Sequence, residues 1–132
     1  MTLTVKVISP GETVLDATAD EVILPSSTGQ LGILTNHAPL TTVLDIGVMR
    51  FKANNQWSAI ALMGGVAEIE ENEVTVLVNS AIAGSKVNVA ETQKELEVAQ
   101  KKLNSLKDDD KQGKMQAEQS VKRIRARLQA AS

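Results

Sequence analysis

The sequence predicts an α+β fold in which strands and helices are segregated: an antiparallel β-sandwich or barrel over residues 1–84, then an antiparallel two-helix hairpin over residues 85–132. Short runs of alternating apolar and polar residues fill the first part, as in strands with one buried face. In the second part apolar residues recur every three or four positions, the period of a helix. The charge also divides: Lys and Arg minus Asp and Glu is 4 − 9 = −5 for residues 1–86, 4 − 6 = −2 for 87–110 and 6 − 1 = +5 for 111–132.

Composition excludes several classes of protein. A chain of 132 residues with 42% hydrophobic residues is long enough for one compact domain, with or without an appendage. The absence of cysteine excludes disulfides, thiolate metal sites and cysteine catalysis. No apolar run approaches the roughly 20 residues of a membrane span, and the first ten residues do not resemble a signal peptide. Phe51 and Trp57 are the only aromatic residues, which argues against a stacking platform for single-stranded nucleic acid.

The first part is predicted to form eight to ten short strands. Leu3–Ile8 alternates strictly and ends at Pro10. Asn54–Asn55 and Glu71–Asn72 are two-residue linkers of the kind found in tight hairpins, because Asn tolerates positive φ. Strands at such close spacing favour antiparallel pairing over βαβ units. The other predicted strands are Thr13–Leu15, Glu21–Leu24, Gln30–Leu34, Thr41–Leu44, Gly47–Ala53, Gln56–Met63, Val66–Glu70 and Glu73–Val78, and the predicted core is Val22, Leu24, Leu31, Ile33, Leu44, Ile60, Leu62, Val76 and Val78.

The second part is predicted to form helices at about 89–106 and 112–131. Asn88 followed by Glu91 is typical of an N-terminal capping box, and Asp109 with Gln112 offers a second cap. The apolar stripes are thin and rich in alanine, so the hairpin gains little by pairing with itself and needs a second surface. The stripes are Val89, Thr92, Leu96, Ala99, Leu103 and Leu106 on the first helix, and Ala117, Val121, Ile124, Leu128 and Ala131 on the second.

The second helix is strongly basic, but at 100° per residue its cations do not share one face. Lys122 lies opposite the apolar stripe, Arg125 flanks it on one side, and Arg123 and Arg127 flank it on the other. Glu118 is spaced to pair with Lys122 at i, i+4. Three interpretations stay open at this point: a solvated helix, a helix that binds an acidic protein, and a helix that binds nucleic acid.

Candidate chemistry is sparse. His37 is the only histidine, so neither a histidine metal cluster nor a triad can be assembled, and a locally hydrogen-bonded turn residue is the simple interpretation. The carboxylates from Glu68 to Glu73 surround a predicted hairpin and indicate a solvated strand face more than an acid/base pair. Gly64–Gly65 lacks the spacing and lysine of a phosphate loop, and Asp108–Asp110 lacks the pattern of a calcium loop. The residues give almost no support to an enzyme.

The stretch Gly29–Thr41, GQLGILTNHAPLT, resembles the most recognisable loop of the ε subunit of rotary ATP synthases, usually G-x-L-G-[IV]-L-P-N-H-A-P-L. Thr35 departs from the usual proline. The resemblance extends in order over nearly the whole chain, and the further segments look like the cyanobacterial and chloroplast branch. These segments are Asp45–Gly47, Asn55–Trp57, Ala61–Gly65 and Glu73–Asn79.

The resemblance implies a β-sandwich of about ten strands followed by an antiparallel helix pair, in a non-catalytic subunit at the foot of the central stalk. The implied partners are the γ subunit, the membrane-embedded c-subunit ring and the β subunit, with no nucleic acid. The chain is then peripheral on the cytoplasmic or stromal side of the thylakoid (or inner) membrane, held there through the complex. The implied contacts to the ring or stalk are Gly29, Gln30 and Leu31 in one loop, and His37, Ala38 and Pro39 in a turn.

The resemblance also implies that the helix pair regulates ATP hydrolysis, either folded against the sandwich or extended along γ. Four residues of the second helix would then meet an acidic segment of the β subunit, and the segment between sandwich and hairpin would be the hinge. The four, called here the basic set, are Lys122, Arg123, Arg125 and Arg127, and the hinge residues are Gly84 and Ser85.

Some members of this family bind ATP through an I-D-x-x-R-A motif at the start of the first helix. The matching stretch here is degenerate: Val87 and Asn88 replace the first two residues, and Glu91 and Thr92 replace the last two. A carboxylate at the position of the arginine repels phosphate. The sequence therefore predicts weak or absent ATP binding, no cofactor and no metal. The alternative function is a free-standing module whose basic helix contacts nucleic acid.

Overall fold

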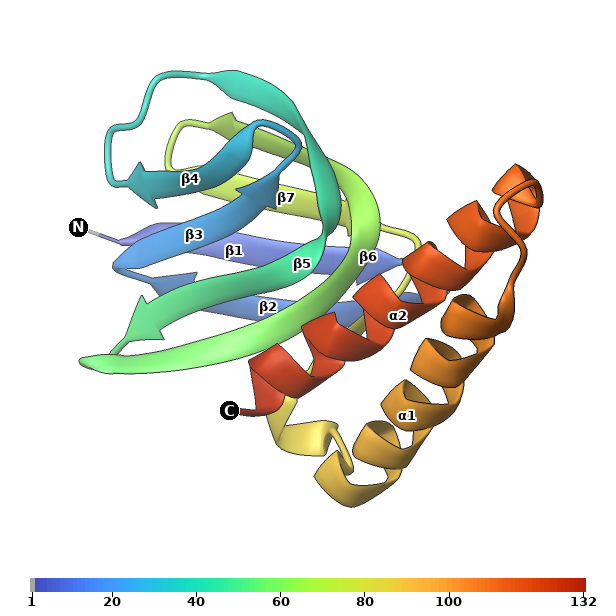
Figure 1. Cartoon of the computed structure of the whole chain (residues 1–132). Coiled ribbons are helices and arrows are strands. Elements are labelled where there is room, and N and C mark those ends of the chain that lie inside the picture. The colour runs from blue at the N-terminus through green and yellow to red at the C-terminus, as the bar shows by residue number, and fades with distance from the viewer. Residues whose placement is uncertain (1) are drawn as a thin grey trace.

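The structure is a computed structural model that describes residues 2–132. Eight strands precede a short 3₁₀ turn and two helices, and the sheet and hairpin occupy separate parts of the molecule (Figure 1). The α+β fold with segregated strands and helices is as predicted. The elements are β1 (Leu3–Ser9), β2 (Glu12–Ala19), β3 (Glu21–Ser26), β4 (Gly29–Leu34), β5 (Leu40–Ala53), β6 (Gln56–Glu70), β7 (Glu73–Val78), β8 (Ala81–Ala83), η1 (Gly84–Lys86), α1 (Val89–Ser105) and α2 (Lys111–Ala131).

The strands form one sheet in the order β2-β1-β7-β6-β5-β3-β4, with β8 added beside β6. All pairs are antiparallel except β1 with β7, which is parallel and corrects the expectation of a purely antiparallel sheet. A parallel pair needs a long connection, and the chain from β2 to β6 supplies it. The placement buries β1 between two neighbours, so that Leu3, Val5 and Val7 are fully buried.

The strand count is eight rather than about ten because β5 and β6 are each continuous where a break was expected. Their pairing keeps one register from Leu40 opposite Ile69 to Ala53 opposite Gln56. Both strands bend at the same level, where Gly64 and Gly65 have φ of 82° and 159°. The buried side chains of β6 change there from even to odd positions, as Ile60 and Leu62 give way to Ala67 and Ile69. The bend folds the sheet over itself into a sandwich (Figure 1).

The core lies between the two layers and agrees with the predicted set. Leu31 is the exception, because it is half-buried and packs at the edge of the core. Both predicted hairpin turns are present, with positive φ at Asn54, Asn55, Glu71 and Asn72. The buried predicted residues are Val22, Leu24, Ile33, Leu44, Ile60, Leu62, Val76 and Val78.

Side chains cap both helices. At α1 the Asn88 side chain accepts a hydrogen bond from the Glu91 amide at 3.1 Å. At α2 the cap is Asp110 and not Asp109, because Asp110 Oδ1 accepts from the Gly113 amide at 2.9 Å. Asp109 stays exposed in the connection between the helices.

Helix α2 lies between α1 and the outer face of the sheet (Figure 1). The predicted residues Ala117, Val121 and Ile124 are buried. A second apolar face, which the sequence analysis did not identify, places Ala126 and Ala130 against Ala61 of β6. This is the second surface that the thin stripes require. Its buried members are the three alanines, and the half-buried residues packed around them are Ile46, Val48, Ala59, Met63 and Ile82.

Candidate functional site

The basic set lies where α2 meets both the sheet and α1. Lys122 Nζ donates to Asp45 Oδ2 at 2.8 Å, and both side chains are about half exposed, at 51% and 49%. Asp45 stands at the bend of β5, where its Oδ1 also accepts from the Ile46 amide at 2.8 Å. The hydrogen bond from Lys122, and after it the one from the Ile46 amide, lowers the pKa of Asp45 below its ordinary value of 3.8.

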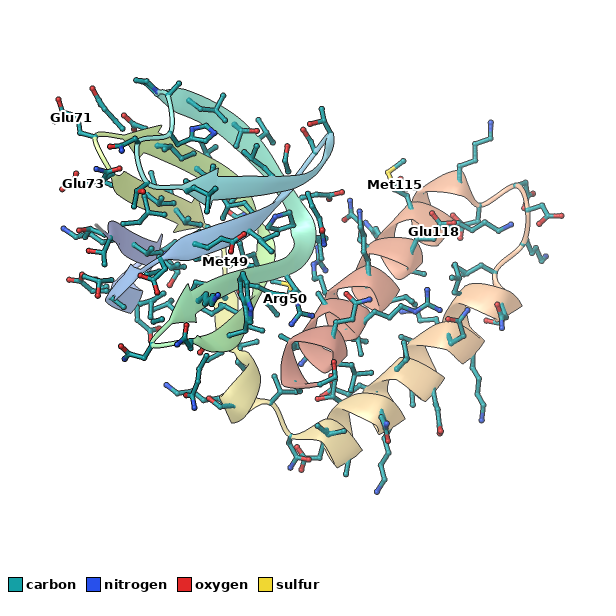
Figure 2. The ribbon with its side chains drawn as sticks, turned by 90° about the vertical axis from the view of Figure 1, so that its left-hand side faces the viewer. Met49, Arg50, Glu71, Glu73, Met115 and Glu118 are labelled. Carbon is teal, nitrogen blue, oxygen red and sulfur yellow. The ribbon has the colours of Figure 1, made fainter. Side chains whose placement is uncertain are left out.

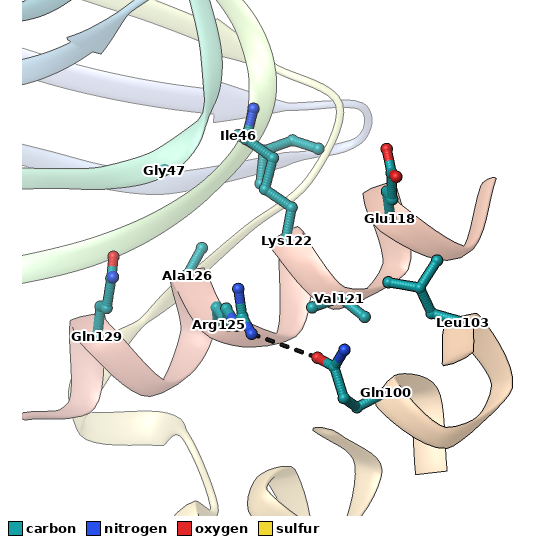
Figure 3. A pocket seen from close by; sticks show the side chains of 10 residues that line it. All are labelled: Ile46, Gly47, Gln100, Leu103, Glu118, Val121, Lys122, Arg125, Ala126 and Gln129. Carbon is teal, nitrogen blue, oxygen red and sulfur yellow. Dashed lines mark hydrogen bonds between the residues drawn. The ribbon is translucent and has the colours of Figure 1, made fainter. Parts of the chain in front are cut away.

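The predicted pairing of Lys122 with Glu118 is wrong, because Lys122 bonds to Asp45 instead. The 100° spacing places Lys122 opposite the helix stripe, and once α2 packs on the sheet that direction points to β5. A pair within one exposed helix is worth only a few tenths of a kcal/mol. Tertiary packing therefore decides the partner, and Figure 3 shows Lys122 extending toward Ile46 of β5.

Two further residues of the basic set join α2 to α1. Arg127 Nη2 donates to Glu95 Oε2 at 2.8 Å, and Arg125 Nη2 donates to Gln100 Oε1 at 3.3 Å (Figure 3). Arg123 is exposed, and within residues 2–132 no hydrogen bond or ion pair of its side chain is present. Three of the four cations thus have partners inside the chain, one on β5 and two on α1.

A hollow of about 420 Å³ lies beside Lys122, between α2, the end of α1 and the bend of β5 (Figure 3). Its walls include Gly47, Leu103 and Val121, with Glu118 and Gln129 at the rim. The hollow shows that α2 is not packed closely on the sheet at this end. A second hollow of about 430 Å³ lies at the other end, beside Gly84 and Ala130.

The predicted hinge lies beneath the C-terminal end of α2. Gly84 is buried, and a Cβ on it would lie 1.9 Å from the carbonyl oxygen of Ala130. Ser85 is exposed in the η1 turn, which closes with a bond from the Val87 amide to the Gly84 carbonyl at 3.2 Å. Glycine is therefore required here because the backbones of η1 and α2 approach closely, and this requirement does not depend on whether Gly84 is also a hinge.

The segment of Gly29, Gln30 and Leu31, expected to be a loop that faces the ring or stalk, is instead the start of β4, where all three residues pair with β3. The turn of His37–Pro39 follows the other end of β4, about 17 Å away for a strand of this length. Gly29 and Gln30 are exposed at one end. At the other, the half-buried His37 is hydrogen-bonded through Nδ1 to the carbonyl oxygen of Ala38 at 2.7 Å, and Pro39 is exposed. The structure therefore places them as two separate exposed sites.

The residues that match the degenerate nucleotide motif form the start of α1 and the segment just before it. Besides the Asn88 cap, Thr92 Oγ1 donates to the Asn88 carbonyl at 2.7 Å, and Thr92 is only 4% exposed. Glu91 is exposed in the first turn, where a carboxylate suits the helix dipole. The polar groups of Asn88 and Thr92 are committed to the helix, and Val87 precedes them half-buried.

One candidate site was missed by the sequence analysis: an exposed apolar row across three neighbouring strands. Val43 pairs with Val66, and Val66 pairs with Leu77. Their exposed fractions are 60%, 40% and 52%, which is unusual for directly adjacent large apolar residues. The signal is present in the sequence, because Leu77 is apolar at a position of β7 where the alternation calls for a polar residue.

The acidic residues of the β6–β7 hairpin face solvent. Glu70 pairs directly with Glu73, and Figure 2 shows Glu71 and Glu73 pointing outward from the tip. Within the part of the chain that the structure describes, no three His, Asp or Glu residues gather as metal ligands. Neither helix of that part combines the length and apolarity of a membrane span. The geometry offers interaction surfaces and no assembled catalytic constellation among residues 2–132.

A family model described as the β-sandwich domain of the ATP synthase delta/epsilon chain matches residues 2–84. The ATP synthase epsilon chain of Nostoc punctiforme is 59% identical over 133 residues, which cover 99% of this chain and 97% of the relative. That of Synechococcus elongatus is 57% identical over 131 residues, covering 99% and 96%. That of Thermosynechococcus vestitus is 55% identical over 132 residues, with the same coverage. The similarity therefore includes the hairpin as well as the sandwich.

Two solved structures share the fold. A chain of the Euglena gracilis mitochondrial ATP synthase (OSCP, F1 and c-ring, rotational state 1) aligns with a TM-score of 0.83 at 19% identity, covering 98% of this chain and 81% of that chain. A chain of the Tetrahymena thermophila mitochondrial ATP synthase central stalk and c-ring aligns with a TM-score of 0.68 at 16% identity, covering 100% and 98%. At these identities the alignments show the fold.

Proposed function

The chain belongs to the ATP synthase epsilon-chain family, and from this membership we propose that it is a non-catalytic rotor subunit that links the γ subunit to the c-subunit ring and restrains ATP hydrolysis. The identity of 59% over 99% of the chain supports a shared role for both the sandwich and the hairpin. These relatives give no support to the nucleic-acid alternative.

The sandwich is the proposed attachment. The apolar row of Val43, Val66 and Leu77 is exposed, as expected of a protein-binding face. We assign it to the γ subunit. The start of β4, at Gly29, Gln30 and Leu31, and the turn of His37, Ala38 and Pro39 remain the proposed contacts to the ring or adjoining stalk, as two sites and not one. The chain would then be peripheral on the cytoplasmic or stromal side of a thylakoid (or inner) membrane, associated through the complex.

The hairpin is the proposed regulator, and the observation that carries this role is how little holds α2 to the sandwich. The buried contact consists of Ala126, Ala130 and Ala61, with half-buried residues around them, and the hollow lies beside it. The three alanines remove little area from water, and the larger residues around them, such as Ile46 and Met63, are only partly buried, so the contact contributes less than a fully packed helix face would. We propose that the hairpin moves about Gly84 and Ser85, and that the basic set then contacts an acidic segment of the β subunit.

The experiment that tests this function compares the full chain with a chain ending at Gly84, each added to a catalytic head that contains γ but lacks this subunit. ATP hydrolysis should be inhibited by the full chain and not by the truncated one, while both should bind γ. Equal inhibition by the two would show that the helices do not regulate. Failure of either to bind would refute the placement in the stalk.

We also propose that ATP is not the switch for this movement. Glu91 repels phosphate, and Asn88 and Thr92 already bond within the helix. Addition of ATP at sub-millimolar concentration should leave the amide chemical shifts of residues 87–128 unchanged. Saturable shifts in that region would refute the proposal.

A further inference from the structure

The folded chain bonds three of the four cations of the basic set, which the proposed function needs, to its own side chains. We propose that Asp45 and Glu95 stand in for the acidic protein segment, so that the folded chain masks Lys122 and Arg127 of the basic set and an acidic partner must displace the two carboxylates. The identity of the partner rests on the proposed function, but the masking is a property of the isolated chain.

Asp45 is built to hold a cation. The amide of Ile46 fixes one carboxylate oxygen at 2.8 Å and leaves the other to accept from Lys122, also at 2.8 Å. The bend of β5 presents the group toward α2, although it is remote in sequence from the helix. Among the ion pairs of residues 2–132, this one alone joins the sandwich to the hairpin. It therefore neutralises Lys122 only while α2 lies on the sheet.

Glu95 and Gln100 act on the other two cations from α1. Arg127 bonds to Glu95 at 2.8 Å with its side chain 29% exposed, and Arg125 bonds to Gln100 at 3.3 Å. These contacts persist only while the two helices remain packed together. Separation of the hairpin from the sandwich frees Lys122, and separation of the helices frees the two arginines. The basic surface is thus released in two steps.

Masking makes the acidic partner compete with the internal carboxylates for the same cations. Each internal partner must be removed before an acidic segment takes its place, so the apparent affinity of the folded chain is reduced. Exposed pairs of this kind are each weak, so the masking at one site amounts to no more than about fivefold in affinity. Because independent sites add in free energy, masking at two sites multiplies.

The test measures binding of a fluorescent poly-glutamate peptide to the isolated full chain by anisotropy at low ionic strength. Variants Asp45→Asn and Glu95→Gln each remove one internal partner, and Glu97→Gln is the matched control. Glu97 is exposed on the same helix, and no ion pair or hydrogen bond of its side chain is present in the described structure. All three variants change the net charge equally, so the control accounts for long-range attraction.

We expect each of Asp45→Asn and Glu95→Gln to bind the peptide about two- to fourfold more tightly than Glu97→Gln, and the double variant about tenfold more tightly. Equal affinity among the three single variants would overturn the proposal. If Asp45→Asn perturbs the sandwich, Glu95→Gln decides alone, because it changes only an exposed helix surface. The peptide assay contains no other subunit, so a negative result there does not contradict the proposed rotor function. Conversely, if the truncated chain inhibits ATP hydrolysis as well as the full chain does, the masking proposal still stands.

Discussion

Asp45 is the single residue on which the attachment of α2 by charge depends. Its carboxylate accepts from the Lys122 ammonium and from the Ile46 amide, and both lower its pKa below 3.8. A group whose pKa is lowered by folding stabilises the folded form above its ordinary pKa, and the stabilisation is lost as the pH falls through the lowered value. Docking of the hairpin should therefore weaken in acid, below the ordinary pKa.

Replacement of Lys122 tests this directly. In Lys122→Met the largest cause of the shift is gone, so the pKa of Asp45 should rise toward 3.8, with only the Ile46 amide still lowering it. Side-chain carboxyl NMR across an acid titration measures the midpoint in each protein. Lys111→Met is the control, because Lys111 is exposed at the start of α2 and has no recorded partner in the described chain. An unchanged midpoint in Lys122→Met would contradict the assigned cause.

Gly84 is required by close approach. In Gly84→Ala the new methyl group would meet the Ala130 carbonyl at 1.9 Å, so the end of α2 must move away. We expect a loss of about 1–3 kcal/mol in stability, concentrated in the hairpin. Hydrogen exchange of the α2 amides should speed up while the core of the sandwich stays protected. Gly32→Ala is the control, since a Cβ there meets nothing within 4 Å, and similar exchange in both variants would argue against the contact.

At the scale of the element, the start of α2 depends on one aspartate among three. Asp110 accepts from the Gly113 amide, so Asp110→Ala should cost about 1 kcal/mol. Asp109→Ala should cost almost nothing, because Asp109 is exposed outside the helix. Thermal unfolding of the full chain, together with hydrogen exchange of the first-turn amides of α2, distinguishes the two variants. Equal losses would mean that the cap is shared between them.

At the scale of the whole molecule, the sheet has an outer face that α2 covers on one side of the β5–β6 bend. Beyond the bend the apolar row stays uncovered. Leu77→Lys should leave the fold unchanged, because Leu77 is 52% exposed, and should weaken binding to γ about ten- to a hundredfold through loss of one buried apolar side chain. Co-purification with γ measures this. Val98→Lys, on α1 at 69% exposed, is the control, and equal weakening in both would refute the assignment.

The division of the molecule follows from local patterns alone. Period-two runs predicted the strands, Asn54–Asn55 and Glu71–Asn72 predicted the turns, and the spacing after Asn88 predicted the first helix. These features depend on neighbours in sequence, so the sequence determined them. The motif at Gly29–Thr41 also indicated the ATP synthase epsilon-chain family, to which the chain belongs.

Other features needed the tertiary structure because they join residues far apart in the chain. The continuity of β5 through its bend depends on pairing with β6, and the parallel neighbour of β1 depends on the path of the whole sheet. The helical spacing showed which way Lys122 points, but only the packing of α2 on the sheet decided that Asp45 receives it. Charge and periodicity in the sequence predict on which face of a helix a side chain lies. Only long-range packing decides which residue of another element that side chain contacts.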